Sequence, residues 1–161
     1  MGRNKKNIQV LKNICDVRTV KKVGFVVLVI GAIHLPAYAQ NKIIATIIGF
    51  ENDKGLCRAC LFNSESGFKN GKPLECVQVP ATNKKATAIF ENIADGTYAI
   101  FVFHDSNNNG IMDKNWLGLP TEGYGASQNK LPFAAAPKFE SNKFSVKDKA
   151  IHQLSIKLRN L

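Results

Sequence analysis

Over residues 43–103 and 142–158 the chain repeats one pattern, a short run of β-branched or alternating apolar residues followed by turn residues. Such runs are typical of β-strands, and no window shows a sustained helical period. The sequence therefore predicts an all-β fold, a single immunoglobulin-like or transthyretin-like β-sandwich of about seven strands. The clearest strand candidates are residues 43–50, 56–62, 84–93, 97–103, 142–146 and 151–158.

Two of the turn segments predict hairpins. Asn52-Asp53-Lys54-Gly55 follows the first strand candidate, and Asp95-Gly96 follows the third. Asn, Asp and Gly favour the left-handed backbone that tight hairpin turns require. We therefore expect each of these two strands to pair with the strand that comes next in the chain.

A long segment, residues 104–141, interrupts the strand pattern. Loops longer than about 15 residues are uncommon in compact domains and are usually functional or disordered. This one contains large apolar side chains that would be costly to leave in water: Trp116, Leu117, Leu119, Tyr124, Phe133 and Phe139. We expect an ordered loop that packs around a small core of its own.

The N-terminal residues 1–39 have the pattern of a secretory signal peptide. Lys21-Lys22 precedes the apolar run 23–33, and Ala37-Tyr38-Ala39 is a small-x-small cleavage sequence. The alternative is a membrane anchor, but a span needs about 20 apolar residues, more than this run supplies. A true start at Val20 would give a signal of ordinary length.

Much of the positive charge belongs to this N-terminal segment. It holds seven of the 22 basic residues and one of the 12 acidic residues, so residues 40–161 carry 15 basic and 11 acidic residues. That balance does not indicate nucleic-acid binding. We expect the mature domain, residues 40–161, to be a monomer exported to the periplasm or the medium, with no membrane span after signal cleavage.

Three cysteines remain in the mature domain: Cys57, Cys60 and Cys76. An odd number in an oxidising compartment predicts one disulfide and one free thiol. Cys57 and Cys60 lie in a strand candidate, where residues three apart face opposite sides of the sheet, so a thioredoxin-like or metal-binding CxxC is disfavoured. We expect a bridge from Cys76 to one member of the pair.

The most chemically specific motif is residues 105–113, Asp-Ser-Asn-Asn-Asn-Gly-Ile-Met-Asp. Oxygen ligands at positions 1, 3, 5, 7 and 9, with glycine at position 6, match the first nine positions of a calcium loop. The predicted ligands are Asp105, Asn107, Asn109, the Ile111 carbonyl and Asp113, with Glu122 as a candidate for one more. Position 12 is Trp116 rather than Glu, so we expect weak calcium binding, with a Kd of about 10⁻⁴ to 10⁻³ M. The alternative is an Asn-rich turn without metal.

Several of these motifs occur together in a recognisable combination. Asp95-Gly96-Thr97-Tyr98 leads into Phe103-His104-Asp105 and the Asn-rich run, and Leu117-Gly118-Leu119-Pro120 and Glu122-Gly123-Tyr124-Gly125 follow. This combination resembles the family called domain of unknown function 2141. The resemblance implies an exported β-sandwich with a shared long loop and implies no activity. Ala126 and the CxxC depart from the family pattern.

Three hypotheses for function follow. The leading one is a non-enzymatic exported binding module whose calcium-ordered loop recognises an unknown protein or carbohydrate ligand. The second is a metal-dependent hydrolase in which His104, Asp105 and Glu122 converge. The third is a purely structural, envelope-associated domain in which calcium only stabilises the fold.

Overall fold

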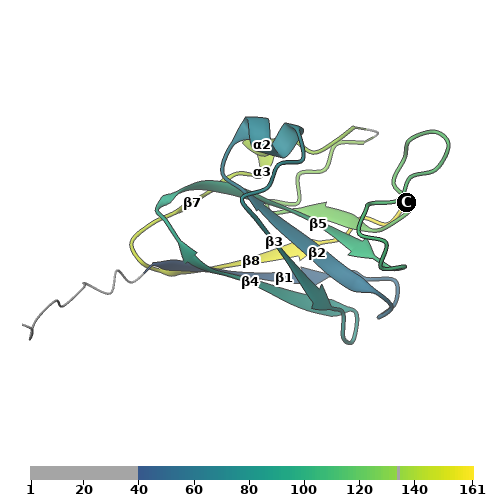
Figure 1. The fold of residues 1–161 in the computed structure, drawn as a ribbon, viewed down its shortest axis with the longest axis horizontal. Helices are drawn as coiled ribbons and strands as arrows, with labels where there is room; N and C mark the ends of the chain where they lie inside the picture. The colour runs from purple at the N-terminus through teal and green to yellow at the C-terminus, as the bar shows by residue number, and fades with distance from the viewer. Residues whose placement is uncertain (1–39, 134) are drawn as a thin grey trace, which may run out of the picture. The chain divides into compact units, whose positions relative to one another are not determined.

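The computed structural model describes residues 40–133 and 135–161, so the predicted signal peptide and the Val20 start lie outside the described residues. The described chain is an all-β sandwich of two sheets, which confirms the predicted fold class (Figure 1). It has eight strands where about seven were expected. The strands are β1 (Asn41–Ile48), β2 (Leu56–Phe62), β3 (Glu75–Pro80), β4 (Lys85–Ile93), β5 (Gly96–Asp105), β6 (Tyr124–Ala126), β7 (Phe144–Val146) and β8 (Ile151–Lys157).

The smaller sheet has the order β4-β1-β8, with β1 antiparallel to β4 and parallel to β8. The larger sheet has the order β3-β2-β5-β6, and β7 pairs with the beginning of β5. Alternating side chains from both sheets fill the space between them, as the two-residue period of a strand requires. The largest fully buried apolar side chains are Phe90, Ile43, Ile47, Leu61, Ile100, Ile156, Val102 and Val146.

Both predicted hairpins are wrong. β1 and β2 belong to different sheets, and so do β4 and β5. The turn residues 49–55 and 94–95 therefore carry the chain from one sheet to the other instead of reversing it within one sheet. Turn chemistry fixes where the chain bends, whereas the sheet that the next strand joins depends on contacts distant in sequence.

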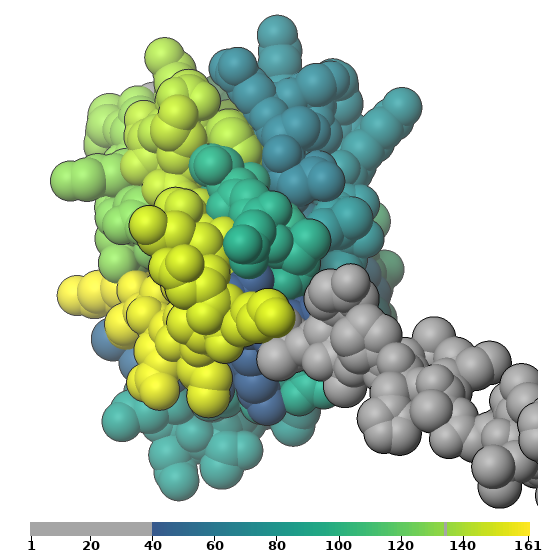
Figure 2. All heavy atoms as spheres, turned by 90° about the vertical axis from the view of Figure 1, so that its left-hand side faces the viewer, coloured from purple at the N-terminus to yellow at the C-terminus, as the bar shows by residue number. Residues whose placement is uncertain are grey.

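Two short helices and two strands were not predicted. Helix α2 (Glu65–Lys69) follows β2, and Ser64 caps it by accepting a hydrogen bond from the Gly67 N–H. Helix α3 (Phe139–Asn142) comes just before β7. The unpredicted strands are β3 and β6. In Figure 2 the blue spheres at the upper right belong to the part of the chain that contains α2, and the light green and yellow spheres on the left belong to the second half of the long segment and to the C-terminal residues.

The two helices carry a second apolar cluster on the outer side of the larger sheet. Phe62 and Phe68 meet edge to face with ring centroids 5.0 Å apart, and Phe68 also contacts Phe101 and Phe139. Phe139 is therefore buried against the sheet, not within a separate core of the long loop.

The second half of the long segment is fixed by polar side chains. Asn142 is fully buried. Its side-chain oxygen accepts the N–H groups of Gln128 and Lys130, and its side-chain nitrogen donates to the carbonyls of Lys130 and Lys138. Asn129 bonds the edge of β8 at Ser155 and Lys157 in the same way. These side chains replace backbone pairing for a segment that contains little regular structure.

Candidate functional site

The candidate site is the loop of residues 105–123, which connects β5 to β6. Asp105 is the last residue of β5 and pairs across the sheet with Leu56 of β2. Glu122 lies two residues before β6. In Figure 1 this loop is the green segment at the right, beside the C-terminus.

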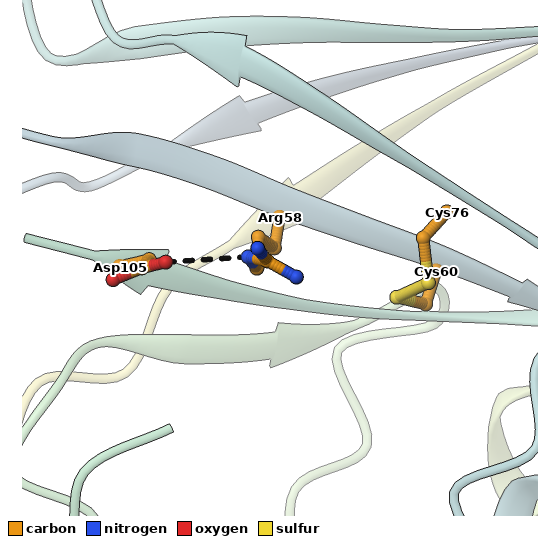
Figure 3. Close-up of a disulfide and its surroundings, with 4 residues drawn as sticks. All are labelled: Arg58, Cys60, Cys76 and Asp105. Carbon is orange, nitrogen blue, oxygen red and sulfur yellow. Dashed lines mark hydrogen bonds and ion pairs between the residues drawn. A yellow bond between two sulfur atoms is a disulfide. The ribbon is translucent and has the colours of Figure 1, made fainter. Parts of the chain in front are cut away.

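Asp105 anchors the start of the loop. Its side chain is 1% exposed, and one carboxylate oxygen accepts the N–H of Asn109 at 3.0 Å. The other oxygen accepts the N–H of Gly110 at 2.9 Å and the Nε–H of Arg58 at 3.2 Å. Figure 3 shows the Arg58 side chain directed at Asp105 on this face of β2. A buried carboxylate needs a compensating charge, and the Arg58 guanidinium supplies that charge for Asp105.

Glu122 holds the two ends of the Asn-rich run together. One of its carboxylate oxygens accepts the Ser106 N–H at 2.9 Å, and the other accepts the Asp113 N–H at 3.1 Å. The residue is buried. Hydrogen bonds to a charged group contribute about 1.5–3 kcal/mol each, so this carboxylate is a strong brace for the loop. Both oxygens have N–H partners in this geometry, so Glu122 braces the loop, and its role as a further calcium ligand stays a prediction.

The remaining predicted calcium ligands lie together on the exposed side of the loop. The side-chain amides of Asn107 and Asn109 both donate to the Asp113 carboxylate, at 2.7 to 3.1 Å. Their amide oxygens accept the N–H groups of Asn109 and Ile111, which is the Asx-turn geometry of an Asn-rich turn. Gly110 adopts φ +85°, and a Cβ there would lie 3.1 Å from an Arg58 guanidinium nitrogen. This position therefore requires glycine.

The donor set fits a hard cation in type but is not arranged as a closed cage. The side chains supply carboxylate and amide oxygens, which calcium prefers. The amides would have to turn their oxygens toward the ion, and Arg58 offsets the charge of Asp105. Within the described ranges, no group of three or more His, Cys, Asp or Glu side chains forms a metal centre. The loop holds its shape through carboxylate, amide and guanidinium groups of the chain itself.

The three residues of the hydrolase hypothesis do not meet. His104 and Asp105 are neighbours in β5, so their side chains leave the sheet on opposite faces. The His104 ring packs edge to face on Phe50 at 5.0 Å, and its Nε2 lies 2.6 Å from the Lys54 carbonyl oxygen. His104 is thus a buried core residue with its own partner.

The tip of the loop is ordered but exposes its apolar side chains. Lys114 and Pro120 form an isolated β-bridge, and the Asn115 side-chain oxygen accepts the N–H groups of Leu117 and Leu119. The expected small core does not form, because Trp116 is 91% exposed and Leu117 is 61% exposed. Among the other residues expected in that core, Tyr124 and Phe139 are buried, whereas Leu119 and Phe133 are exposed.

The cysteines divide as their strand positions require. Cys60 and Cys76 face each other across β2 and β3 and form a disulfide, which lies on the same face of β2 as Arg58 (Figure 3). Cys57 is a free thiol on the inner face, and burial raises its pKa to about 12. A thiol in that state is a poor nucleophile and a poor metal ligand.

Arg58 is the site residue that the sequence reasoning missed. Its signal was its position: it is the one charged residue in the apolar run 56–62, at a place where alternation points the side chain outward.

The comparisons give the chain a family but no activity. A family model described as "Uncharacterized protein conserved in bacteria (DUF2141)" matches residues 45–153. No curated protein and no solved structure matches the chain. Among the described residues, none of the helices has the length and apolar character that crossing a membrane demands.

Proposed function

Because this chain belongs to the DUF2141 family of uncharacterised bacterial proteins, we propose its function from its own residues: a non-enzymatic, exported binding module. The recognition element is the tip of the loop, defined here as residues 111–119 and called the Trp116 tip. The observation that carries this proposal is the 91% exposure of Trp116 on a loop whose base is firmly braced. A large apolar side chain held in water by an ordered backbone is typical of a binding site.

The base and the Trp116 tip have different roles in this proposal. Asp105 and Glu122 use all four carboxylate oxygens on the backbone and on Arg58, so they fix the loop. The side chains of the tip residues Ile111, Trp116, Leu117 and Leu119 have no such internal role and are exposed. A rigid base lowers the entropy lost when the tip binds, because less of the loop remains to be ordered.

The absence of a converging catalytic set among the described site residues supports a binding role over the hydrolase. His104 is committed to Phe50 and Lys54, away from the two carboxylates. The expected protein or carbohydrate ligand stays a prediction. The aliphatic residues of the tip favour an apolar surface over a sugar, whose hydroxyls need free polar partners, and the Asn115 oxygen is already used by the backbone.

Export is part of the proposal and has one independent support. The Cys60–Cys76 disulfide is expected in an oxidising compartment such as the periplasm or the medium, and not in a reducing cytosol.

We propose that calcium adds weak stability to the loop through Asp105, Asn107, Asn109, the Ile111 carbonyl and Asp113. Binding at ten times Kd would add about 1.4 kcal/mol. The measurement is thermal unfolding of residues 40–161 in EDTA and in about 5 mM calcium, given the millimolar Kd expected. Asp113→Ala should abolish the calcium-induced rise in Tm, and Asp148→Asn, which changes an exposed acid elsewhere, should keep it. No rise in the unmodified protein would refute the calcium site.

The binding role itself is tested with the double variant Trp116→Ala/Leu117→Ala. Its free energy of unfolding should stay within about 0.5 kcal/mol of the parent value, because exposed side chains contribute little to stability. Its sedimentation with a cell-envelope fraction of the source bacterium should be lost. A variant that is strongly destabilised, or that still sediments, would support the purely structural, envelope-associated alternative instead.

A further inference from the structure

A second exposed apolar side chain, Phe133, lies on a segment that the C-terminal residues connect to the base of the Trp116 loop. Phe133 is 93% exposed, which makes it and Trp116 the two most exposed large apolar residues of the described chain. The backbone carbonyls of Leu131 and Pro132 accept hydrogen bonds from the Arg159 guanidinium. The following residue, Asn160, lies against Gly123 at the base of the Trp116 loop. The C-terminal residues therefore hold the bases of both loops side by side.

The stretches around Trp116 and Phe133 are basic, and the acids that flank them have partners of their own: Asp113 accepts the amides of Asn107 and Asn109, and Glu140 pairs with Lys143. Residues 114–121 contain Lys114 and no Asp or Glu, and residues 127–139 contain Lys130 and Lys138 and no Asp or Glu. Lys130 and Lys138 line an open depression together with Leu131 and Pro132, directly beside Phe133. The whole segment 124–161 has seven basic and two acidic residues.

Resting on the proposed function, we propose that the surface recognised by the two tips, at Trp116 and at Phe133, is an anionic lipid bilayer, contacted from one side without crossing. Trp and Phe partition into the interfacial region of a bilayer, and Leu and Ile enter its apolar edge. Lysines beside them meet the negative headgroups. The depression between Lys130 and Lys138 is placed to receive a headgroup phosphate. A convex apolar tip needs a pocket to dock on a protein, whereas lipid chains rearrange around it.

The chain supplies its own probe for the test. Trp116 is the one tryptophan of the sequence, so intrinsic tryptophan fluorescence reports on this tip alone. On titration with vesicles containing phosphatidylglycerol, we expect a blue shift and protection from a soluble quencher. Three lysines near the surface correspond to about a hundredfold stronger binding than on phosphatidylcholine vesicles, decreasing with added salt. Equal binding to both vesicle types, or no blue shift on either, would overturn the proposal.

Co-sedimentation with the same vesicles extends the test to variants that lack the probe. Trp116→Ala and Phe133→Ala should each weaken binding about tenfold or more, and Lys130→Ala/Lys138→Ala should remove most of the preference for anionic lipid. Leu74→Ala, an exposed apolar residue outside both loops, should bind like the parent protein. Equal loss in the Leu74 variant would overturn the assignment to the tips.

Failure of the lipid proposal can be told from failure of the binding role. Sedimentation with the cell envelope that depends on Trp116, without binding to pure lipid vesicles, would refute the bilayer and keep the binding module, with an envelope protein or glycan as partner. Loss of stability in the tip variants would refute both.

Discussion

Replacing Arg58 by Met should destabilise the calcium-free protein and strengthen calcium binding at the same time. The guanidinium lies 3.2 Å from a carboxylate that is 1% exposed, while the Arg58 side chain is 26% exposed. Removing one partner of a fully buried pair costs about 3–5 kcal/mol. Because Arg58 is partly solvated and two backbone N–H groups still bond Asp105, we expect a loss of about 2 kcal/mol.

The gain in calcium affinity follows from the charge that is removed. A guanidinium and a divalent cation about 6 Å apart repel by roughly 5 kcal/mol at an effective dielectric constant of about 20. Solvent and salt reduce this to about 1–2 kcal/mol at a partly exposed site, which corresponds to about a tenfold lower Kd. The calcium-induced rise in Tm should accordingly be larger in Arg58→Met than in the parent protein.

The assay is thermal unfolding with EDTA and at several calcium concentrations, with Lys42→Met as the matched control. Lys42 forms an exposed ion pair with Glu91 at 2.8 Å, on the smaller sheet. Its loss should cost less than about 1 kcal/mol and leave the calcium response unchanged. If Arg58→Met loses stability but shows no stronger calcium response, Asp105 is not a calcium ligand. If it loses no stability, the Arg58–Asp105 pair does not support the loop.

Three further predictions concern the brace and the cysteines. Glu122→Gln should lower the free energy of unfolding by about 1.5–3 kcal/mol, because an amide group replaces one oxygen that accepts a loop N–H. Amide hydrogen exchange should become faster at Ser106 or Asp113 first. Uniform acceleration across the sandwich would contradict a local brace. Reduction of Cys60–Cys76 should cost about 3 kcal/mol by denaturant unfolding for a loop of this separation, and a Cys60→Ser/Cys76→Ser variant that is insensitive to reductant is the control. Cys57 should resist alkylation at pH 8 in the folded protein, because its pKa is raised from 9.0 to about 12. The stability that this thiol contributes is therefore complete below pH 9 and falls as the pH rises toward 12. Cys57→Ala should abolish this fall in stability between pH 9 and 12.

The fold class could be read from the sequence, but the strand pairing could not. β-Branched alternation marks a strand and its buried face, because that signal is local. It led to six of the eight strands. The parallel pairing of Lys42 with Ile151 joins residues from opposite ends of the domain, and no local signal specifies it. β3 was missed because it is an edge strand with only two half-buried side chains and a final proline, and β6 because it spans three residues.

In the candidate loop, too, the sequence indicated local features and could not indicate contacts between residues distant in sequence. The motif spacing located Asp105, Asn109, Asp113 and Glu122 in one structural unit. It could not show that Arg58, from a strand distant in sequence, supplies the positive charge beneath it. Hydrophobicity led us to expect that Trp116 and its neighbours pack in a small core of the loop, and that core does not form. It could not show whether the chain or a partner covers them, because the same transfer energy favours both.

The hydrogen bonds that the carboxylates of the loop form argue for a binding partner over a purely structural role. A loop that served only to complete the sandwich would be expected to bury its apolar residues, as Tyr124 and Phe139 do. Here the buried carboxylates instead satisfy backbone N–H groups at the base, and the Asn115 oxygen satisfies two more at the tip. This internal bonding keeps the tip ordered while its apolar side chains remain outside. Apolar surface that internal hydrogen bonds keep exposed leaves water only when a partner covers it. The Trp116 variants measure the free energy of that burial, because they lack the side chain that would be covered.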